Sequence, residues 1–121
     1  MRQKVVEAMP SSRFKQLTMT TYFITRHPGA IAWAKQQGIS VDRQMTHLDI
    51  SDIKKGDIVI GSLPVNLAAE ICQRGASYIH IALTVPESWR GKELTMEQMV
   101  EFGARLEGYA LKKIDGDQLQ K

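Results

Sequence analysis

The sequence has little cysteine and no long apolar run. Cys72 is the single cysteine among 121 residues, so no internal disulfide can form, which fits the reducing environment of the cytoplasm. No stretch approaches the about 18 apolar residues that a membrane-spanning helix needs. The first residues also lack the apolar segment of about 7–15 residues that is typical of secretory signals. We therefore expect a soluble cytoplasmic protein that does not contact a membrane.

Motifs for metals and nucleotide cofactors are absent as well. There is no cluster of His and Cys with zinc-binding spacing. Asp49, Asp52 and Asp57 lack the spacing of a calcium loop and are interpreted as turn residues. Neither G-x-x-x-x-G-K-[ST] nor G-x-G-x-x-G occurs. We expect no metal and no cofactor.

The excess of positive charge is small and local. The net charge is +3, and residues 1–18 hold four basic residues against one acidic residue, whereas the rest of the chain is balanced. Long nucleic acids need a broad basic face with many phosphate contacts, so we do not expect them as partners. A compact site with a few well-placed cations is compatible with this composition.

The chain divides into one domain and two polar ends. Residues 1–18 show no clean hydrophobic period and are predicted to be a flexible extension; their basic character also allows an organelle-import signal, although a short basic tail is commoner. Residues 19–111 are expected to form a single domain with an ordinary core. Residues 112–121 are predicted to be a polar tail.

Strand and helix patterns alternate along this domain. The order predicts an α/β fold with a mostly parallel sheet of four to five strands and helices on both faces. A capping box at Thr95 and Gln98 begins the last predicted helix, whose apolar stripe runs from Met96 to Ala110. The predicted strands are 21–25, 39–48, 57–62 and 76–83, and the predicted helices are 30–37, 64–74 and 96–110.

Two strand-to-helix turns carry the candidate site, residues 25–29 and 61–66. Ligands of open α/β sheets gather outside the carboxyl ends of the strands, and each turn leads into a helix N-terminus, which favours phosphate. Arg26 supplies a permanent forked cation, and His27 supplies a group that exchanges a proton near neutral pH. Ser62 and Asn66 add small hydrogen-bonding side chains beside the second turn.

Each of these residues also has a purely structural interpretation. Arg26 and His27 can form a surface corner with an ion pair, and Ser62 or Asn66 can act as a helix cap. His80 alternates with core residues, so a hydrogen-bonded structural histidine and a site residue both fit. His47 lies in a turn without an evident partner, and we expect no role for it. The remaining candidates are assigned to packing. Cys72 is expected in the core, and Trp33 and the methionines of the last predicted helix are expected in the core or in a dimer face.

Four segments carry a family resemblance: residues 21–30 (TYFITRHPGA), 47–49 (HLD), 61–70 (GSLPVNLAAE) and 90–95 (RGKELT). They resemble a family of small CRISPR-associated ancillary proteins of type III systems, over about residues 19–106. The resemblance implies a Rossmann-like fold related to domains that sense cyclic oligoadenylates (CARF-like). It also implies ring-nuclease activity, in which a homodimer without metal binds cyclic tetra-adenylate and cuts it to end the immune signal.

Position and residue type then suggest roles for this reaction. Arg26 and the helix N-termini are expected to bind phosphate, and His27 to act as general base or acid, with His80 in reserve. Arg90, in the loop after the fourth strand, is expected to close over the ring. The expected product is a linear adenylate with a 2′,3′-cyclic phosphate. Further ligand contacts are expected at Thr25, Pro28, Gly29, Ser62, Leu63 and Asn66.

Two other functions fit the same residues. A binding module would sequester the cyclic messenger in the same pocket without cutting it. A histidine phosphatase places an Arg-His-Gly motif after its first strand, and Arg26-His27 resembles it, but Pro28 intervenes before Gly29 and no second set of arginine and histidine is evident.

Overall fold

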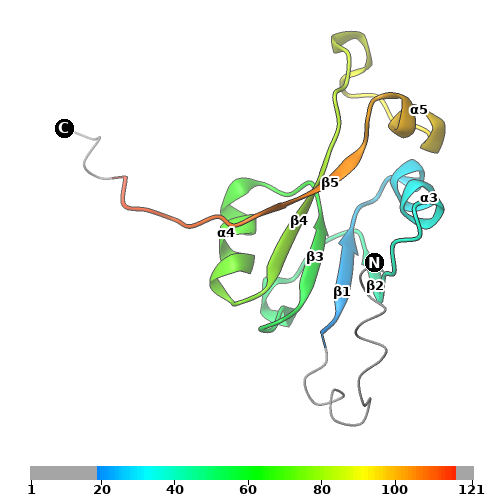
Figure 1. The fold of residues 1–121 in the computed structure, drawn as a ribbon. Helices are drawn as coiled ribbons and strands as arrows, with labels where there is room; N and C mark the ends of the chain where they lie inside the picture. The colour runs from blue at the N-terminus through cyan, green and yellow to red at the C-terminus, as the bar shows by residue number, and fades with distance from the viewer. Residues whose placement is uncertain (1–18, 117–121) are drawn as a thin grey trace.

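Five strands form one sheet at the centre of the protein (Figure 1). The computed structural model describes residues 19–116; the predicted extension 1–18 and the end of the predicted tail, 117–121, lie outside the described residues. The strand order is β2-β1-β3-β4-β5; the neighbours from β2 to β4 run parallel, and β5 runs antiparallel to β4. The predicted α/β, Rossmann-like fold with a mostly parallel sheet is confirmed. The strands are β1 Thr21–Ile24, β2 Arg43–Met45, β3 Ile58–Gly61, β4 Ser77–Ala82 and β5 Arg105–Tyr109.

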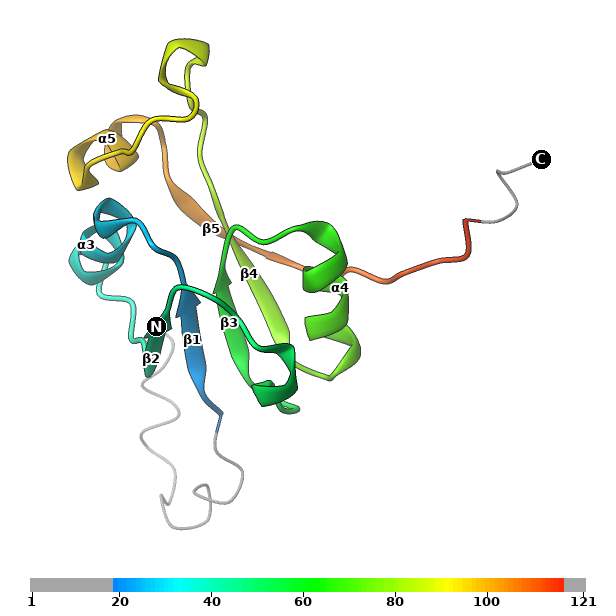
Figure 2. The same ribbon diagram turned by 180° about the vertical axis from the view of Figure 1, so that it is seen from behind.

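Helices cover both faces of this sheet, as predicted. Helix α4 (Val65–Gln73) and the 3₁₀ turn η1 (Ile50–Asp52) lie on one face, and α3 (Pro28–Gln36) and α5 (Met96–Glu101) lie on the other (Figures 1 and 2). Proline is the first residue of α3, because its fixed φ suits a first turn where its missing N–H is not needed. Pro64 is the N-cap residue that directly precedes α4. No helix among residues 19–116 is both long and apolar enough to cross a membrane.

The core is split into two layers by the sheet. Consecutive strand residues point to opposite faces, so Tyr22 and Val59 pack beneath α4, whereas Phe23 and Ile60 pack beneath α3 and α5. This explains the continuous apolar runs of β1 and β3, since a strand covered on both faces needs apolar residues at every position. Trp33, which is 3% exposed, lies in the second layer, so its predicted role in packing is confirmed.

The prediction of a helix from Met96 to Ala110 is wrong in its second half. The capping box is present, with Thr95 Oγ1 accepting from the Gln98 N–H, but α5 ends at Glu101. Gly103 then adopts φ +74°, a left-handed conformation that ends a helix. Leu106 lies in β5, opposite Ile81 of β4, and Ala110 follows that strand. Pairing with the exposed edge of β4 satisfies backbone groups that a longer helix would leave open.

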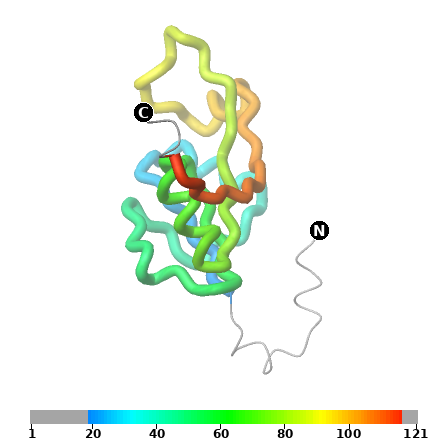
Figure 3. The backbone as a smooth tube through the Cα atoms, turned by 90° about the vertical axis from the view of Figure 1, so that its left-hand side faces the viewer, coloured from blue at the N-terminus to red at the C-terminus, as the bar shows by residue number. Residues whose placement is uncertain are grey.

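The segment between β4 and α5, residues 83–95, extends beyond the carboxyl ends of the parallel strands (yellow in Figures 1 and 2). It contains a single 3₁₀ turn, η2 (Glu87–Trp89). The side view also shows this segment at the top of the molecule (Figure 3). The last residues of this segment lead into α5 and contact the first turn of α3.

Candidate functional site

A cavity of about 510 Å³ opens at the carboxyl ends of β1, β2 and β3. Its volume lies in the range usual for small-molecule sites. Three strand-end segments supply much of its wall: residues 25–27 after β1, 46–48 after β2 and 62–64 after β3. Lys92 and Leu94 join from the segment before α5. Both strand-to-helix turns of the predicted site therefore contribute residues to the wall of this cavity.

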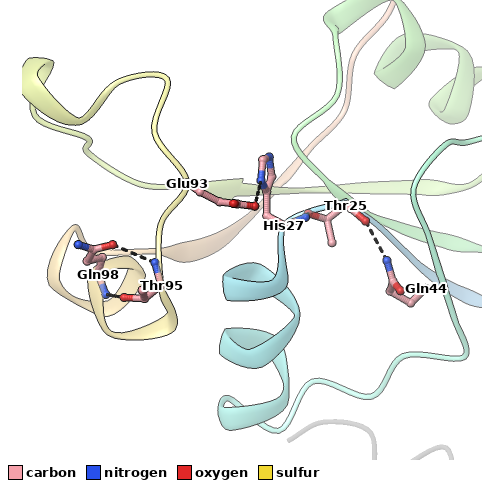
Figure 4. Close-up of polar contacts among 6 residues, drawn as sticks. All are labelled: Thr25, His27, Gln44, Glu93, Thr95 and Gln98. Atoms are coloured by element: carbon pink, nitrogen blue, oxygen red, sulfur yellow. Dashed lines mark hydrogen bonds and ion pairs between the residues drawn. The ribbon is translucent and has the colours of Figure 1, made fainter.

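The turn between β1 and α3 is fixed by local hydrogen bonds. The His27 N–H donates to Thr25 Oγ1 at 3.1 Å, and the His27 carbonyl accepts from the Ala30 N–H at 3.0 Å in the first turn of α3. Nδ1 of His27 lies 3.5 Å from Oε2 of Glu93 (Figure 4). This contact places one ring nitrogen toward Glu93 and leaves Nε2 outside it.

The turn between β3 and α4 is held by a buried tyrosine. The Leu63 N–H donates to the Tyr78 hydroxyl at 2.9 Å, and that hydroxyl also lies 3.2 Å from the Gly61 carbonyl and 2.7 Å from Nδ1 of His80. Burial raises the pKa of Tyr78, so the phenol stays neutral. His80 thus supports the turn through Tyr78. Ser62 is tied to β4 by a hydrogen bond from its Oγ to the Ile81 carbonyl at 3.2 Å.

The segment before α5 reaches the cavity because it packs tightly on the start of α3. An ideal Cβ on Gly29 would lie 2.0 Å from the Leu94 carbonyl oxygen, so only glycine permits this approach. The ammonium of Lys92 lies 5.2 Å from the centroid of the Trp89 ring, at the far end of the same segment. Close packing at Gly29 therefore brings a lysine of a distant loop to the strand ends.

The residues that line the cavity are of two chemical kinds. Four of them are basic or titratable, Arg26, His27, His47 and Lys92, and no Asp or Glu is among the lining residues. The apolar residues suit the face of a nucleobase, and the basic residues suit a phosphate. Two helix N-termini border the same space, because His27 precedes α3 and Pro64 precedes α4. The apolar lining residues are Ile24, Ala30, Leu48, Leu63, Pro64, Leu67, Ile81, Leu83, Leu94 and Met99.

The structure brings half of the predicted site residues together. Thr25, Arg26, His27, Ser62 and Leu63 all line the cavity, whereas Pro28, Gly29, Asn66, His80 and Arg90 do not. Gly29 contributes by its packing against Leu94, and His80 by its bond to Tyr78.

Sequence reasoning missed Thr46, His47 and Lys92. His47 had been given no role because it lies in a turn, yet it lines the cavity. The sequence feature that could have identified His47 is the position of its turn directly after a strand, because parallel strands end at the same edge of the sheet. Lys92 lies inside the segment 90–95 that carried the family resemblance, two residues after the predicted Arg90.

Two of the carboxylates that the sequence assigns to turns, Asp49 and Asp57, accept hydrogen bonds from the backbone. Asp49 Oδ1 accepts from both the N–H and the hydroxyl of Ser51, which lowers the pKa of Asp49. Asp57 is buried and accepts from the N–H groups of Thr20 and Lys54. Residues 19–116 contain no group of three or more His, Cys, Asp or Glu that is placed to hold a metal ion.

A protein-family model matches most of the chain. The model described as "Putative CRISPR-associated protein (Cas_VVA1548)" matches residues 22–112, which include the whole lining of the cavity and all five strands except Thr21, the first residue of β1. Neither the curated proteins nor the solved structures contain a match.

Proposed function

Since the chain belongs to the Cas_VVA1548 family of CRISPR-associated proteins, we propose that it is a ring nuclease, which cleaves cyclic tetra-adenylate to linear adenylates with 2′,3′-cyclic phosphate ends. Such cleavage would switch off type III CRISPR signalling in the cytoplasm. The observation that carries the proposal is the cavity at the strand ends, whose lining includes four basic or titratable residues and ten apolar residues but no Asp or Glu.

The chemistry needs few groups because RNA carries its own nucleophile. The ribose 2′-oxygen attacks the adjacent phosphorus, the P–O5′ bond breaks, and the phosphate becomes a 2′,3′-cyclic diester. The protein has to hold the 2′-oxygen in line with the leaving oxygen, stabilise added charge on the phosphate and move protons. None of these tasks requires a metal or a cofactor.

Arg26 and the helix N-termini are the proposed phosphate ligands. A guanidinium donates two parallel hydrogen bonds to phosphate oxygens, and the N-termini of α3 and α4 offer N–H groups with partial positive charge. His27 is the proposed proton-transfer group, with Glu93 orienting its ring. Leu63 and the apolar lining residues would contact an adenine base.

A homodimer suits the shape of this ligand. Cyclic tetra-adenylate repeats approximately fourfold, and a two-fold axis presents the same cavity to opposite phosphates of one ring. A small ligand with four negative charges also suits this protein, because its charges outside residues 1–18 sum to zero.

The decisive experiment uses the full chain with radiolabelled cyclic tetra-adenylate in excess EDTA. The expected result is a linear product with a 2′,3′-cyclic phosphate, identified by mass spectrometry. Stoichiometric retention of intact ring would contradict catalysis and support a sequestering module. Release of inorganic phosphate from p-nitrophenyl phosphate that is lost on His27→Ala would favour a phosphatase instead.

A further inference from the structure

His47 lies two residues after the end of β2, which pairs with β1. The Thr25 N–H donates to the Met45 carbonyl at 2.9 Å, and Nε2 of Gln44 donates to the Thr25 carbonyl at 2.8 Å (Figure 4). Neighbouring strands lie about 4.8 Å apart, so these bonds hold the segment that contains His47 against the segment that contains His27. Both histidines line the same cavity from neighbouring strand ends.

The backbone of His47 is anchored on both sides. β2 ends two residues before it, and Leu48, directly after it, packs against the core layer beneath α4. Asp49 then caps η1 by accepting from Ser51. His47 is thus an exposed side chain on a fixed backbone, which is what a positioned catalytic group requires.

The two histidines differ in their surroundings. Nδ1 of His27 faces Glu93, an arrangement in which a carboxylate orients an imidazole for proton transfer through the other nitrogen. His47 has no hydrogen-bond or ion-pair partner within residues 19–116. Its ring therefore has no structural task that would occupy it, and His47 is one of the residues that line the cavity.

Cleavage by a 2′-hydroxyl involves two proton transfers at opposite ends of the reacting phosphate. The attacking and leaving oxygens lie roughly in line through phosphorus, so one imidazole cannot serve both in a single step. We propose that His47 is the general acid of this reaction, the partner of His27 as general base. This inference rests on the proposed function.

The step balances without a further reactant. Nε2 of neutral His27 takes the proton of the 2′-hydroxyl while the 2′-O–P bond forms. Protonated His47 gives a proton to the 5′-oxygen while the P–O5′ bond breaks. The products are a 2′,3′-cyclic phosphate and a 5′-hydroxyl, with the two histidines left in exchanged protonation states that solvent restores.

The first test compares the full-length wild-type protein with His47→Ala and His47→Gln. We expect both variants to bind cyclic tetra-adenylate within about threefold of wild type and to cleave it 10²–10⁴-fold more slowly. Glutamine keeps a hydrogen-bonding group but cannot donate a proton in this pH range. The pH profile of kcat/KM should lose its alkaline limb in both variants, because that limb reports the acid losing its proton. Circular dichroism and thermal unfolding check that both variants fold.

The second test bypasses the general acid. In cyclic tetra-adenylate with one 5′-bridging phosphorothiolate, the leaving group is a thiolate that departs without protonation. We expect His47→Ala to cleave this substrate within about tenfold of wild type, whereas His27→Ala remains slow.

The outcomes separate this inference from the proposed function. No linear product from the wild-type protein would overturn both. Cleavage by wild type together with an unchanged rate in His47→Ala would overturn the role of His47 alone. The assignment of His47 as the acid would also be wrong if His47→Ala lost the same fraction of its rate on cyclic tetra-adenylate and on the phosphorothiolate. It would equally be wrong if the phosphorothiolate restored cleavage by His27→Ala and not by His47→Ala.

Discussion

Nδ1 of His27 lies 3.5 Å from Oε2 of Glu93, so the end of β1 and the segment before α5 meet through these two side chains (Figure 4). The two side chains are 58% and 61% exposed, and exposed pairs contribute about 1 kcal/mol or less to stability. The contact therefore matters through the orientation that it gives to the imidazole rather than through folding.

Glu93→Gln tests this orientation. We expect cleavage of cyclic tetra-adenylate to slow on the order of tenfold, while the free energy of unfolding changes by less than about 1 kcal/mol. Single-turnover rates and urea unfolding measure the two effects. Glu101→Gln, an exposed glutamate at the end of α5, is the matched control and should leave the rate unchanged. An unaltered rate in Glu93→Gln would remove Glu93 from the site.

Arg26→Ala tests the phosphate contact. Hydrogen bonds to charged groups contribute about 1.5–3 kcal/mol, so we expect the Kd for cyclic tetra-adenylate to rise roughly 10- to 100-fold. Calorimetry measures the affinity, and the binding should also depend less on salt. Arg43→Ala, an exposed arginine of β2 that does not line the cavity, should bind as wild type does. Equal effects in the two variants would indicate a general charge effect.

His27→Ala tests proton transfer separately from binding. The expected result is a fall in kcat of about 10²–10⁴-fold with a much smaller change in Kd. Single-turnover kinetics and calorimetry on the same preparation give both numbers. If rate and affinity fall by the same factor, His27 binds the ligand and does not transfer the proton.

Gly29→Ala tests the packing that brings Lys92 to the cavity. The new Cβ would lie 2.0 Å from the Leu94 carbonyl oxygen, so the backbone has to move, and overpacking of this kind costs about 1–3 kcal/mol. Urea unfolding should show this loss. Gly116→Ala, with nothing within 4 Å of its Cβ, is the control. A stability of Gly29→Ala equal to that of wild type would contradict the close approach.

Tyr78→Phe tests the support of the turn between β3 and α4. The variant leaves the Leu63 N–H without its partner, which should cost about 1–3 kcal/mol at neutral pH. Burial raises the pKa of Tyr78 above its ordinary value of 10.0. A raised pKa in the folded state contributes stability that is complete below pH 10.0 and is lost as the pH rises through the folded-state pKa. In urea unfolding across this range, wild type should therefore lose stability more steeply than Tyr78→Phe; parallel profiles would contradict the shift.

Local patterns in the sequence were sufficient for much of the fold. The β-branched run before Arg26 and the proline after His27 dictate a strand that turns into a helix, because these preferences act within a few residues. The capping box at Thr95 likewise marks the start of α5 by local hydrogen bonds alone. The position of the two turns at one edge then follows from parallel strands.

Tertiary structure determined where α5 ends and which residues line the cavity. The stripe from Met96 to Ala110 has a helical period, yet Leu106 pairs with Ile81, because the open edge of β4 offers backbone partners that the local sequence does not contain. His47 enters the cavity because β2 pairs with β1, and Lys92 because Gly29 lets the segment before α5 approach. The sequence by itself determined which segments turn at the strand ends; strand pairing and helix packing, which join residues distant in the chain, determined which side chains meet there.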